Sequence, residues 1–301
     1  MTKIRDRRPR NTLTLILILA VALAALAGSV VLWVGGPIDG DKYTDLGVSL
    51  FVSAIVGLGI IVIERSLARY TSSRDAAAAD EQRFLASLLA SEDLTGVRLR
   101  GRVLSSVMLA GRDLTAADLT DAVLDRADLR GVSAVGVMLS GAVAADANFS
   151  RCDLRSATAE SFSSTESSFV AANFGESVLT SASFVRCPMS GVRFYNALLD
   201  GATFVGSDLK QADLGRAEGT GTMFPSADLR AAKFVASHLV RPNFSGADLR
   251  GADLSSALWD EPDLRGTDLR DCVTIGTIIN KPRSNSETRW PESYRTTTGV
   301  N

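Results

Sequence analysis

The side chains that could perform catalysis or hold a metal ion are few in this chain. His238 is its one histidine, and no cysteine stands close to it in the sequence. One imidazole alone cannot make a zinc site, so we expect His238 to be a surface side chain. The chain has no GxxxxGKS/T phosphate loop, no HExxH motif and no GxSxG motif. The sequence therefore predicts a protein that is not an enzyme and that needs no cofactor or metal.

Carboxylates are abundant, but their spacing is that of a repeat rather than that of an acid–base pair. Asp stands directly before a large apolar residue many times, for example at Asp113, Asp118, Asp128, Asp153, Asp208 and Asp213. Because the repeat itself explains these carboxylates, no pair of them is predicted to be catalytic.

A five-residue repeat from Glu92 to Leu269 organises the chain. In steps of five from Leu94 to Leu269, 31 of 36 positions are Leu, Phe, Met or Trp. Of the 36 residues that stand two places before these positions, 30 are Ala, Ser, Thr, Cys or Val. This period fits neither a helix nor an alternating strand. One large and one small inward residue in every five suit a chain that turns a corner every five residues. Four corners close a square coil of twenty residues.

Residues twenty apart should then stack on the same face of a tube. Two columns of phenylalanine have this spacing: Phe184, Phe204, Phe224 and Phe244 in one, and Phe174, Phe194 and Phe234 in the other. We expect these seven rings to form a structural core ladder. If successive coils pair backbone to backbone at about 4.8 Å, nine coils make a rod on the order of 40 Å long.

Units such as Ala127-Asp128-Leu129-Arg130-Gly131 and Ala247-Asp248-Leu249-Arg250-Gly251 resemble the A(D/N)LXX signature of the pentapeptide-repeat family. The resemblance implies a right-handed quadrilateral β-helix, a pentapeptide-repeat solenoid of about nine coils over residues 92–274. It implies no single function. One branch of the family consists of acidic rods that imitate DNA and bind DNA gyrase.

The charge of the repeat region bears on that branch. Between Ser91 and Thr274 there are 24 Asp or Glu and 18 Lys or Arg, a net charge of −6. A DNA duplex carries one negative charge per about 1.7 Å of axis, so this rod falls far short of it on average. Only a one-sided acidic stripe would keep DNA mimicry as an alternative. The whole chain is near neutral, at −2, so nucleic acid is not an expected partner.

Three cysteines, Cys152, Cys187 and Cys272, occupy the small position of the repeat. We expect them to be small buried hydrophobes. Cys152 and Cys187 are seven repeats apart, which is not a multiple of four, so they should lie on different faces. A disulfide is therefore not expected, in agreement with a reducing compartment.

Two uncharged runs precede the repeats. Residues 13–34 and 46–63 would form helices about 33 Å and 27 Å long, enough to span a bilayer. Five Lys or Arg precede the first run and three follow the second, against one in residues 35–45. By the positive-inside rule, both termini would be cytoplasmic. A cleaved signal peptide, suggested by Ala25-Leu26-Ala27, and a buried soluble hairpin are the alternatives.

Small residues recur every four positions within both runs. They are Ala20, Ala24 and Gly28 in the first run and Ser49, Ser53 and Gly57 in the second. Such stripes let helices approach closely, so these six are candidate helix-packing residues within the hairpin or in a homo-oligomer.

The predicted order of segments follows. It comprises a basic cytoplasmic N-terminus (1–12), a transmembrane helix (13–34), a short external loop (35–45), a second transmembrane helix (46–63), a linker and capping helix (64–91), the solenoid (92–274), and a C-terminal cap with a polar tail (275–301). Disorder is expected beyond Lys281, with Trp290 as a candidate anchor.

These features predict a multi-pass protein of the plasma (inner) membrane that serves as a scaffold. Its partners would be the lipid bilayer and an unknown cytoplasmic protein bound by the solenoid. The alternatives are a DNA-mimicking inhibitor or protector of DNA gyrase and a membrane sensor or assembly factor that acts through the hairpin.

Overall fold

The computed structural model describes residues 42–91 and 93–292. The chain divides into two compact units, and the boundary lies between Ala86 and Ser87. One helix, α2 (Lys42–Ala90), spans 49 residues without a break. No proline interrupts this stretch, so no backbone donor is missing from its hydrogen-bond ladder. The helix continues through residues 64–74, where the sequence predicted a linker, and it begins inside the loop predicted over residues 35–45.

The predicted membrane location is wrong. Within residues 42–91 and 93–292, no helix is long and apolar enough to cross a bilayer. The first predicted span, 13–34, lies outside the described residues, and the second, 46–63, is one part of α2. The prediction considered only the length of the uncharged run over residues 46–63. The helix that contains this run is longer and continues into the charged residues Glu64, Arg65 and Arg69.

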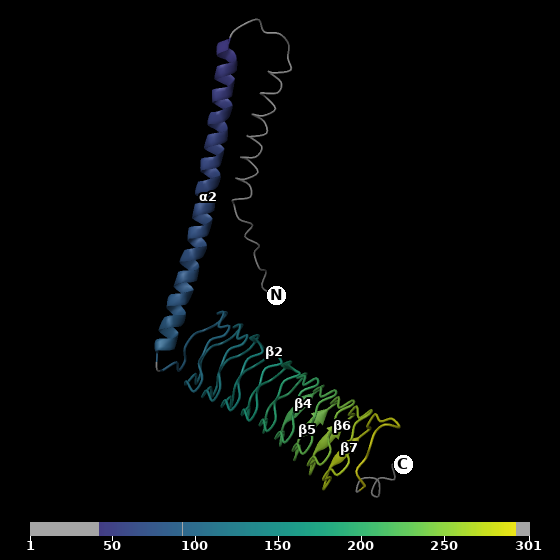
Figure 1. Cartoon of the computed structure of the whole chain (residues 1–301). Coiled ribbons are helices and arrows are strands. Elements are labelled where there is room, and N and C mark those ends of the chain that lie inside the picture. The colour runs from purple at the N-terminus through teal and green to yellow at the C-terminus, as the bar shows by residue number, and fades with distance from the viewer. Residues whose placement is uncertain (1–41, 92, 293–301) are drawn as a thin grey trace. The chain divides into compact units, whose positions relative to one another are not determined.

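From Asp93 onward the chain forms a β-solenoid whose coils stack along one axis (Figure 1). Parallel bridges join residues twenty apart, and one series runs from Asp93 to Val273 in nine successive steps. The Leu99 amide donates to the Asp118 carbonyl at 2.7 Å, and the Asp118 amide donates to the Val97 carbonyl at 2.9 Å. Neighbouring coils thus satisfy each other's backbone polar groups, as a buried backbone requires.

The corners of the coils share one backbone conformation. Every described residue with a positive φ lies two places after the large inward residue, and 24 of these residues are not glycine. At a typical corner the Val97 amide donates to the Leu94 carbonyl at 3.1 Å, and Gly96 has a φ of 65°. Glycine adopts this conformation at no steric cost, whereas other residues are strained.

This shared conformation predicts opposite effects for two matched substitutions. Gly131, with a φ of 64° and no atom within 4 Å of an added Cβ, should lower the free energy of unfolding by about 1 kcal/mol when changed to alanine. Ala231→Gly, at a φ of 55°, should raise that energy. Urea denaturation followed by circular dichroism measures both, and changes of the same sign would contradict the explanation.

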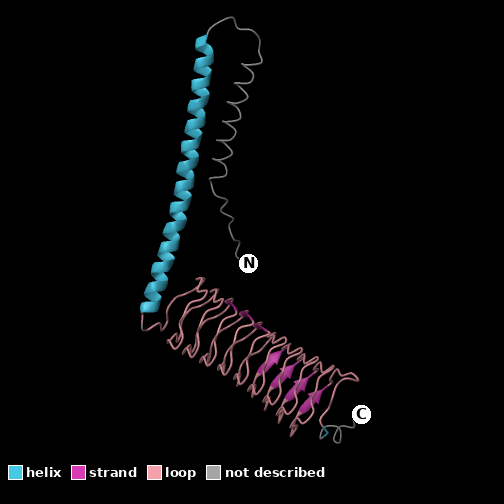
Figure 2. Cartoon of the chain, viewed as in Figure 1, coloured by secondary structure: helices cyan, strands magenta, loops and turns pink. Residues whose placement is uncertain are grey.

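At seven corners the turn opens and short strands replace it (Figure 2). The strands β1 (Val143–Ala145), β2 (Ser163–Thr165) and β3 (Ser183–Val185) form one parallel sheet. A second parallel sheet has the order β4 (Glu218–Thr220), β5 (His238–Val240), β6 (Leu258–Asp260) and β7 (Ile278–Asn280). The remainder of each coil consists of turns and single bridges.

Stacked aromatic rings fill the centre of the solenoid. The ring centroids of Phe184 and Phe204 are 5.3 Å apart, those of Phe204 and Phe224 5.1 Å, and those of Phe224 and Phe244 5.0 Å, with interplanar angles of 4–6°. Trp259 continues the stack 4.5 Å from Phe244. Such pairs stabilise by about 0.5–1.5 kcal/mol beyond the burial of their area.

The second phenylalanine column lies in the same core. Phe174 and Phe194 stack at 5.4 Å, and Phe234 meets Phe224 and Phe244 edge to face at 6.1 Å and 5.8 Å. All seven rings of the two columns are at most 1% exposed. Phe162, at a place normally given to a small residue, is also 1% exposed and lies 5.8 Å from Phe184. Ser164, two residues later, has a small side chain at a place that the repeat usually gives to a large one.

Both ends of the solenoid are covered by chain segments that belong to the same unit. At the first coil, Leu88 is 4% exposed, and the Arg112 guanidinium donates to the carbonyls of Leu89 and Ser91 at 2.8 Å and 2.6 Å. These bonds satisfy carbonyls at the end of α2. Capping of this kind protects the unpaired backbone of the first coil.

At the last coil, the disorder expected beyond Lys281 is wrong for residues 282–292. Leu264 donates to the Arg283 carbonyl at 2.7 Å, and Thr288 donates through Oγ1 to the Leu264 carbonyl at 2.8 Å. Trp290 is only 7% exposed. The polar composition of the tail hid this order, because backbone pairing rather than apolar burial holds most of it.

Candidate protein-binding faces of the solenoid

Each face of the solenoid displays the residues that flank the large inward side chain. The residue before it forms one column and the residue after it forms a second, and the bridges between coils keep both columns in register. Two of these surfaces are the candidate binding surfaces.

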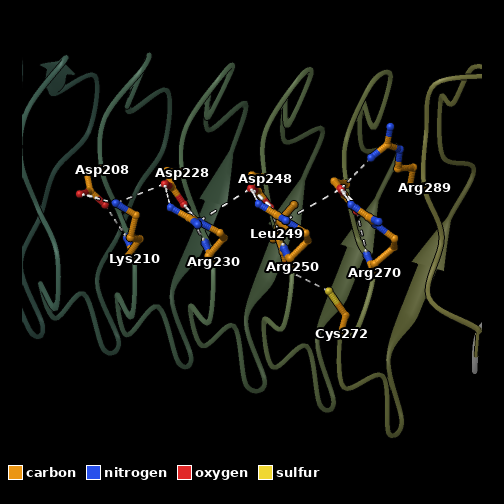
Figure 3. Close-up of polar contacts among 11 residues, drawn as sticks. Asp208, Lys210, Asp228, Arg230, Asp248, Leu249, Arg250, Arg270, Cys272 and Arg289 are labelled. Atoms are coloured by element: carbon orange, nitrogen blue, oxygen red, sulfur yellow. Dashed lines mark hydrogen bonds and ion pairs between the residues drawn. The ribbon is translucent and has the colours of Figure 1, made fainter.

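The first is a charge ladder that crosses the second half of the solenoid (Figure 3). Its members are Asp208, Lys210, Asp228, Arg230, Asp248, Arg250, Asp268, Arg270 and Arg289. Within each coil the cation binds the carboxylate two residues earlier. Arg250, for example, donates from Nε to Oδ1 of Asp248 at 2.9 Å and from Nη2 to Oδ2 at 2.7 Å.

Ion pairs also connect neighbouring coils of the charge ladder. Lys210 lies 3.3 Å from Asp228, and Arg250 lies 4.0 Å from Asp268. Asp268 has a further cation, Arg289, at 3.4 Å. Every carboxylate of the ladder is therefore neutralised by arginine or lysine, and this face is not an acidic stripe.

The carboxylates of the ladder should make the solenoid sensitive to acid. Hydrogen bonds from Arg250 and Arg270 hold the pKa of Asp248 and of Asp268 below the ordinary 3.8, although burial acts in the opposite direction. Because these folded-state pKa values are lowered, the stabilisation is present above about pH 4 and is lost as the pH falls through them.

We therefore expect the urea midpoint to change little between about pH 7 and pH 5 and to fall below about pH 4. Asp248→Asn and Asp268→Asn together should reduce that acid-induced fall, because two of the titrating groups are removed. Urea titrations at a series of pH values measure it. An equal fall in the double variant would show that other groups dominate.

The second candidate surface is the part of one face that leads up to β4 and includes it. We call it the mixed face and define it by Met138, Ser140, Thr158, Glu160, Val178, Thr180, Leu198, Asp200, Glu218 and Thr220. Met138 and Leu198 are each 41% exposed. Glu160, Asp200 and Glu218 are exposed and make no ion pair with any described lysine or arginine. Apolar side chains and unneutralised carboxylates thus lie side by side here.

The three cysteines and the histidine, whose side chains could take part in catalysis, lie in the core or on the surface of the solenoid. Cys152 is buried and donates to the Leu129 carbonyl at 2.7 Å, and burial raises its pKa to about 12. Burial likewise raises the pKa of Cys187, and that of Cys272 to about 12. A thiol with so high a pKa is a poor nucleophile. His238 is exposed on β5, and no metal-binding cluster occurs among the described residues.

The candidate helix-packing residues divide between two parts of the chain. Ala20, Ala24 and Gly28 lie outside the described residues. Ser49, Ser53 and Gly57 belong to α2, and nothing described lies within 4 Å of a Cβ added at Gly57. Their packing role stays a prediction.

The sequence shows carboxylates followed two residues later by arginine, as at Asp248 and Arg250, but it did not identify the ion pairs between coils or the mixed face. The signal for the ladder was present, since Asp-Leu-Lys or Asp-Leu-Arg recurs at exact steps of twenty from Asp208 to Arg270. The mixed face has a weaker signal, because Met138, Val178 and Leu198 are apolar at a position that the repeat usually gives to polar residues.

The comparisons with known proteins agree with this geometry. A family model for pentapeptide repeats matches in eight copies over residues 93–131, 109–143, 197–234 and 237–273, and these segments cover about six of the twenty-residue coils. No curated protein matches the chain at a significant level.

Several solved structures are similar to it. HetL, a pentapeptide repeat protein involved in heterocyst differentiation regulation from the cyanobacterium Nostoc, is 24% identical over 65% of this chain and 91% of its own, with a TM-score of 0.32. Full-length QnrB1, a plasmid-mediated fluoroquinolone resistance protein, is 15% identical over 61% and 94%, with a TM-score of 0.40. A pentapeptide repeat protein of the Arabidopsis thaliana thylakoid lumen is 23% identical over 44% and 71%, with a TM-score of 0.20. The five-residue register and the twenty-residue coils of the structure are therefore accompanied by pentapeptide-repeat matches over residues 93–143, 197–234 and 237–273.

Proposed function

We propose that this protein is a non-catalytic scaffold that binds another protein through an outer face of its solenoid. One observation carries the proposal. The bridges between coils hold the outward side chains in straight columns over a fully buried aromatic core. Such a surface is ordered before a partner arrives, so little conformational entropy is lost on binding. Repeat solenoids present wide rigid surfaces of this kind without a pocket.

The test compares partners captured by the full chain and by variants of single faces. One variant set changes the charge ladder, for example Arg230→Ser and Arg250→Ser, and another changes the mixed face, for example Leu198→Asn. A partner retained by the unmodified chain and lost with only one set supports the scaffold. Equal capture by all variants, or capture of no protein by the unmodified chain, contradicts it.

A second candidate is a DNA-mimicking inhibitor or protector of DNA gyrase. The carboxylates Glu160, Asp200 and Glu218, which have no lysine or arginine partner among the described residues, favour it, because they form a one-sided acidic feature that the average charge conceals. The apolar residues between them weaken it, since a duplex surface is charged throughout. A supercoiling assay with gyrase and the full chain separates the candidates. Absence of both inhibition and protection at micromolar protein removes this one.

A further inference from the structure

We infer that the mixed face binds a cationic amphipathic helix of a partner protein, laid along the axis of the solenoid. The inference rests on the proposed scaffold function and names its surface and the chemistry of its partner. It combines a largely apolar column, carboxylates that make no ion pair with a described lysine or arginine, and the spacing between coils.

The apolar column gives the contact area. Met138, Thr158, Val178 and Leu198 follow one another in four successive coils and are joined by parallel bridges. Met138 and Leu198 are each 41% exposed, and Val178 and Thr158 are partly exposed. The column is apolar in three of its four coils, since Thr158 adds a hydroxyl. An exposed apolar strip with a polar border is typical of a protein–protein interface.

The second column sets the charge of the partner. Glu160 and Asp200 lie two residues beyond Thr158 and Leu198, on the same face, and Glu218 extends the first column by one coil. These carboxylates are exposed and have no cation within ion-pair distance among the described residues. On the charge ladder, by contrast, each carboxylate already has its arginine or lysine. A partner with lysine or arginine beside an apolar stripe would therefore complement the mixed face.

The spacing selects a helix among cationic partners. Two coils of the solenoid span about 9.6 Å, which separates Met138 from Val178 and Glu160 from Asp200. Seven residues of an α-helix rise about 10.5 Å. A helix with one apolar stripe and one lysine per seven residues would thus meet an apolar side chain and a carboxylate at every second coil. The mismatch is about 1 Å per heptad, so two heptads stay in register.

Other occupants fit less well. A second copy that placed the same face here would bring carboxylates against carboxylates. Nucleic acid would also be repelled by these carboxylates. Of these three occupants, only the helix satisfies both columns.

The test uses a dye-labelled three-heptad peptide with leucine at two positions and lysine at one neighbouring position of each heptad. Its binding to the full chain is measured by fluorescence anisotropy. We expect saturable binding that weakens as salt rises. A scrambled peptide of the same composition, and a peptide with glutamate in place of lysine, should bind at least about tenfold more weakly. No binding, or equal binding of the scrambled peptide, overturns the inference.

Variants of the full chain locate the site. Leu198→Asn and Glu160→Lys should each raise the Kd of the peptide by about tenfold. The matched controls are Val235→Asn, which is 37% exposed on another face, and Glu287→Lys, which is exposed near the last coil. Each control should change the Kd by less than about twofold. Equal losses in variants and controls overturn the assignment to the mixed face.

The two proposals can fail separately. A captured partner that requires the charge ladder and ignores Leu198→Asn overturns this inference and leaves the scaffold standing. Failure to capture any protein, together with failure to bind the peptide, overturns both.

Discussion

Phe224→Ala should lower the free energy of unfolding by about 3–5 kcal/mol. Phe224 is fully buried and lies between Phe204 and Phe244, with ring centroids 5.1 Å and 5.0 Å away. Removal of the ring loses its hydrophobic burial and leaves a cavity between two rings that cannot close, because the bridged backbone fixes the distance between coils. Urea denaturation followed by circular dichroism measures the change.

Two controls define what this result means. Phe224→Leu retains most of the volume and should cost less than about 1.5 kcal/mol. Tyr195→Ala removes an aromatic ring that is 43% exposed, so its effect should be much smaller. If Phe224→Ala and Tyr195→Ala shifted the midpoint equally, the stack would not be the main source of stability.

Gly219→Leu should destabilise the protein by about 1–3 kcal/mol or more, although leucine is the usual residue at its place in the repeat. A Cβ at Gly219 would lie 3.1 Å from the carbonyl carbon and oxygen of Leu199 and much closer to Oγ1 of Thr222. Thr222 is fully buried, and its hydroxyl donates to the Leu199 carbonyl at 2.9 Å, so it cannot move away freely. The larger side chain would therefore have to shift backbone.

The same urea titration measures this effect, with Gly131→Ala as the comparison. That substitution adds backbone strain but meets no atom within 4 Å, so Gly219→Leu should have the larger effect. A gain in stability for Gly219→Leu would show that the repeat pattern alone determines what this position accepts.

The sequence predicted the solenoid because its signal is strictly periodic. The twenty-residue spacing of Phe184, Phe204, Phe224 and Phe244 follows directly from four corners per coil, and the rings stack as that spacing requires. The repeat was less informative where a position departs from the pattern, as at Gly219. Nothing in the pattern showed that the open turn at Gly219 brings the Leu199 backbone and the Thr222 hydroxyl against it.

The prediction of a membrane-spanning helix over residues 46–63 failed for a different physical reason. The argument for residues 46–63 used the number of uncharged residues, and the structure has one helix that runs from Lys42 to Ala90. The pairs within a coil of the charge ladder can be read from the sequence, because each arginine follows its aspartate by two residues, as in Asp248-Leu249-Arg250. The ion pairs between coils and the lack of a cation at Glu160 could not be read in this way, because they depend on the residues in adjacent coils.

The exact twenty-residue step has a consequence for how such a chain can change its length. Deletion or duplication of a complete coil would keep every later column on its original side. Gain or loss of a single pentamer would instead rotate all later side chains by one quarter turn and divide each surface in two. The only 21-residue step among the described bridges, from Asp268 to Arg289, lies at the final coil, where no further coil is left to be displaced.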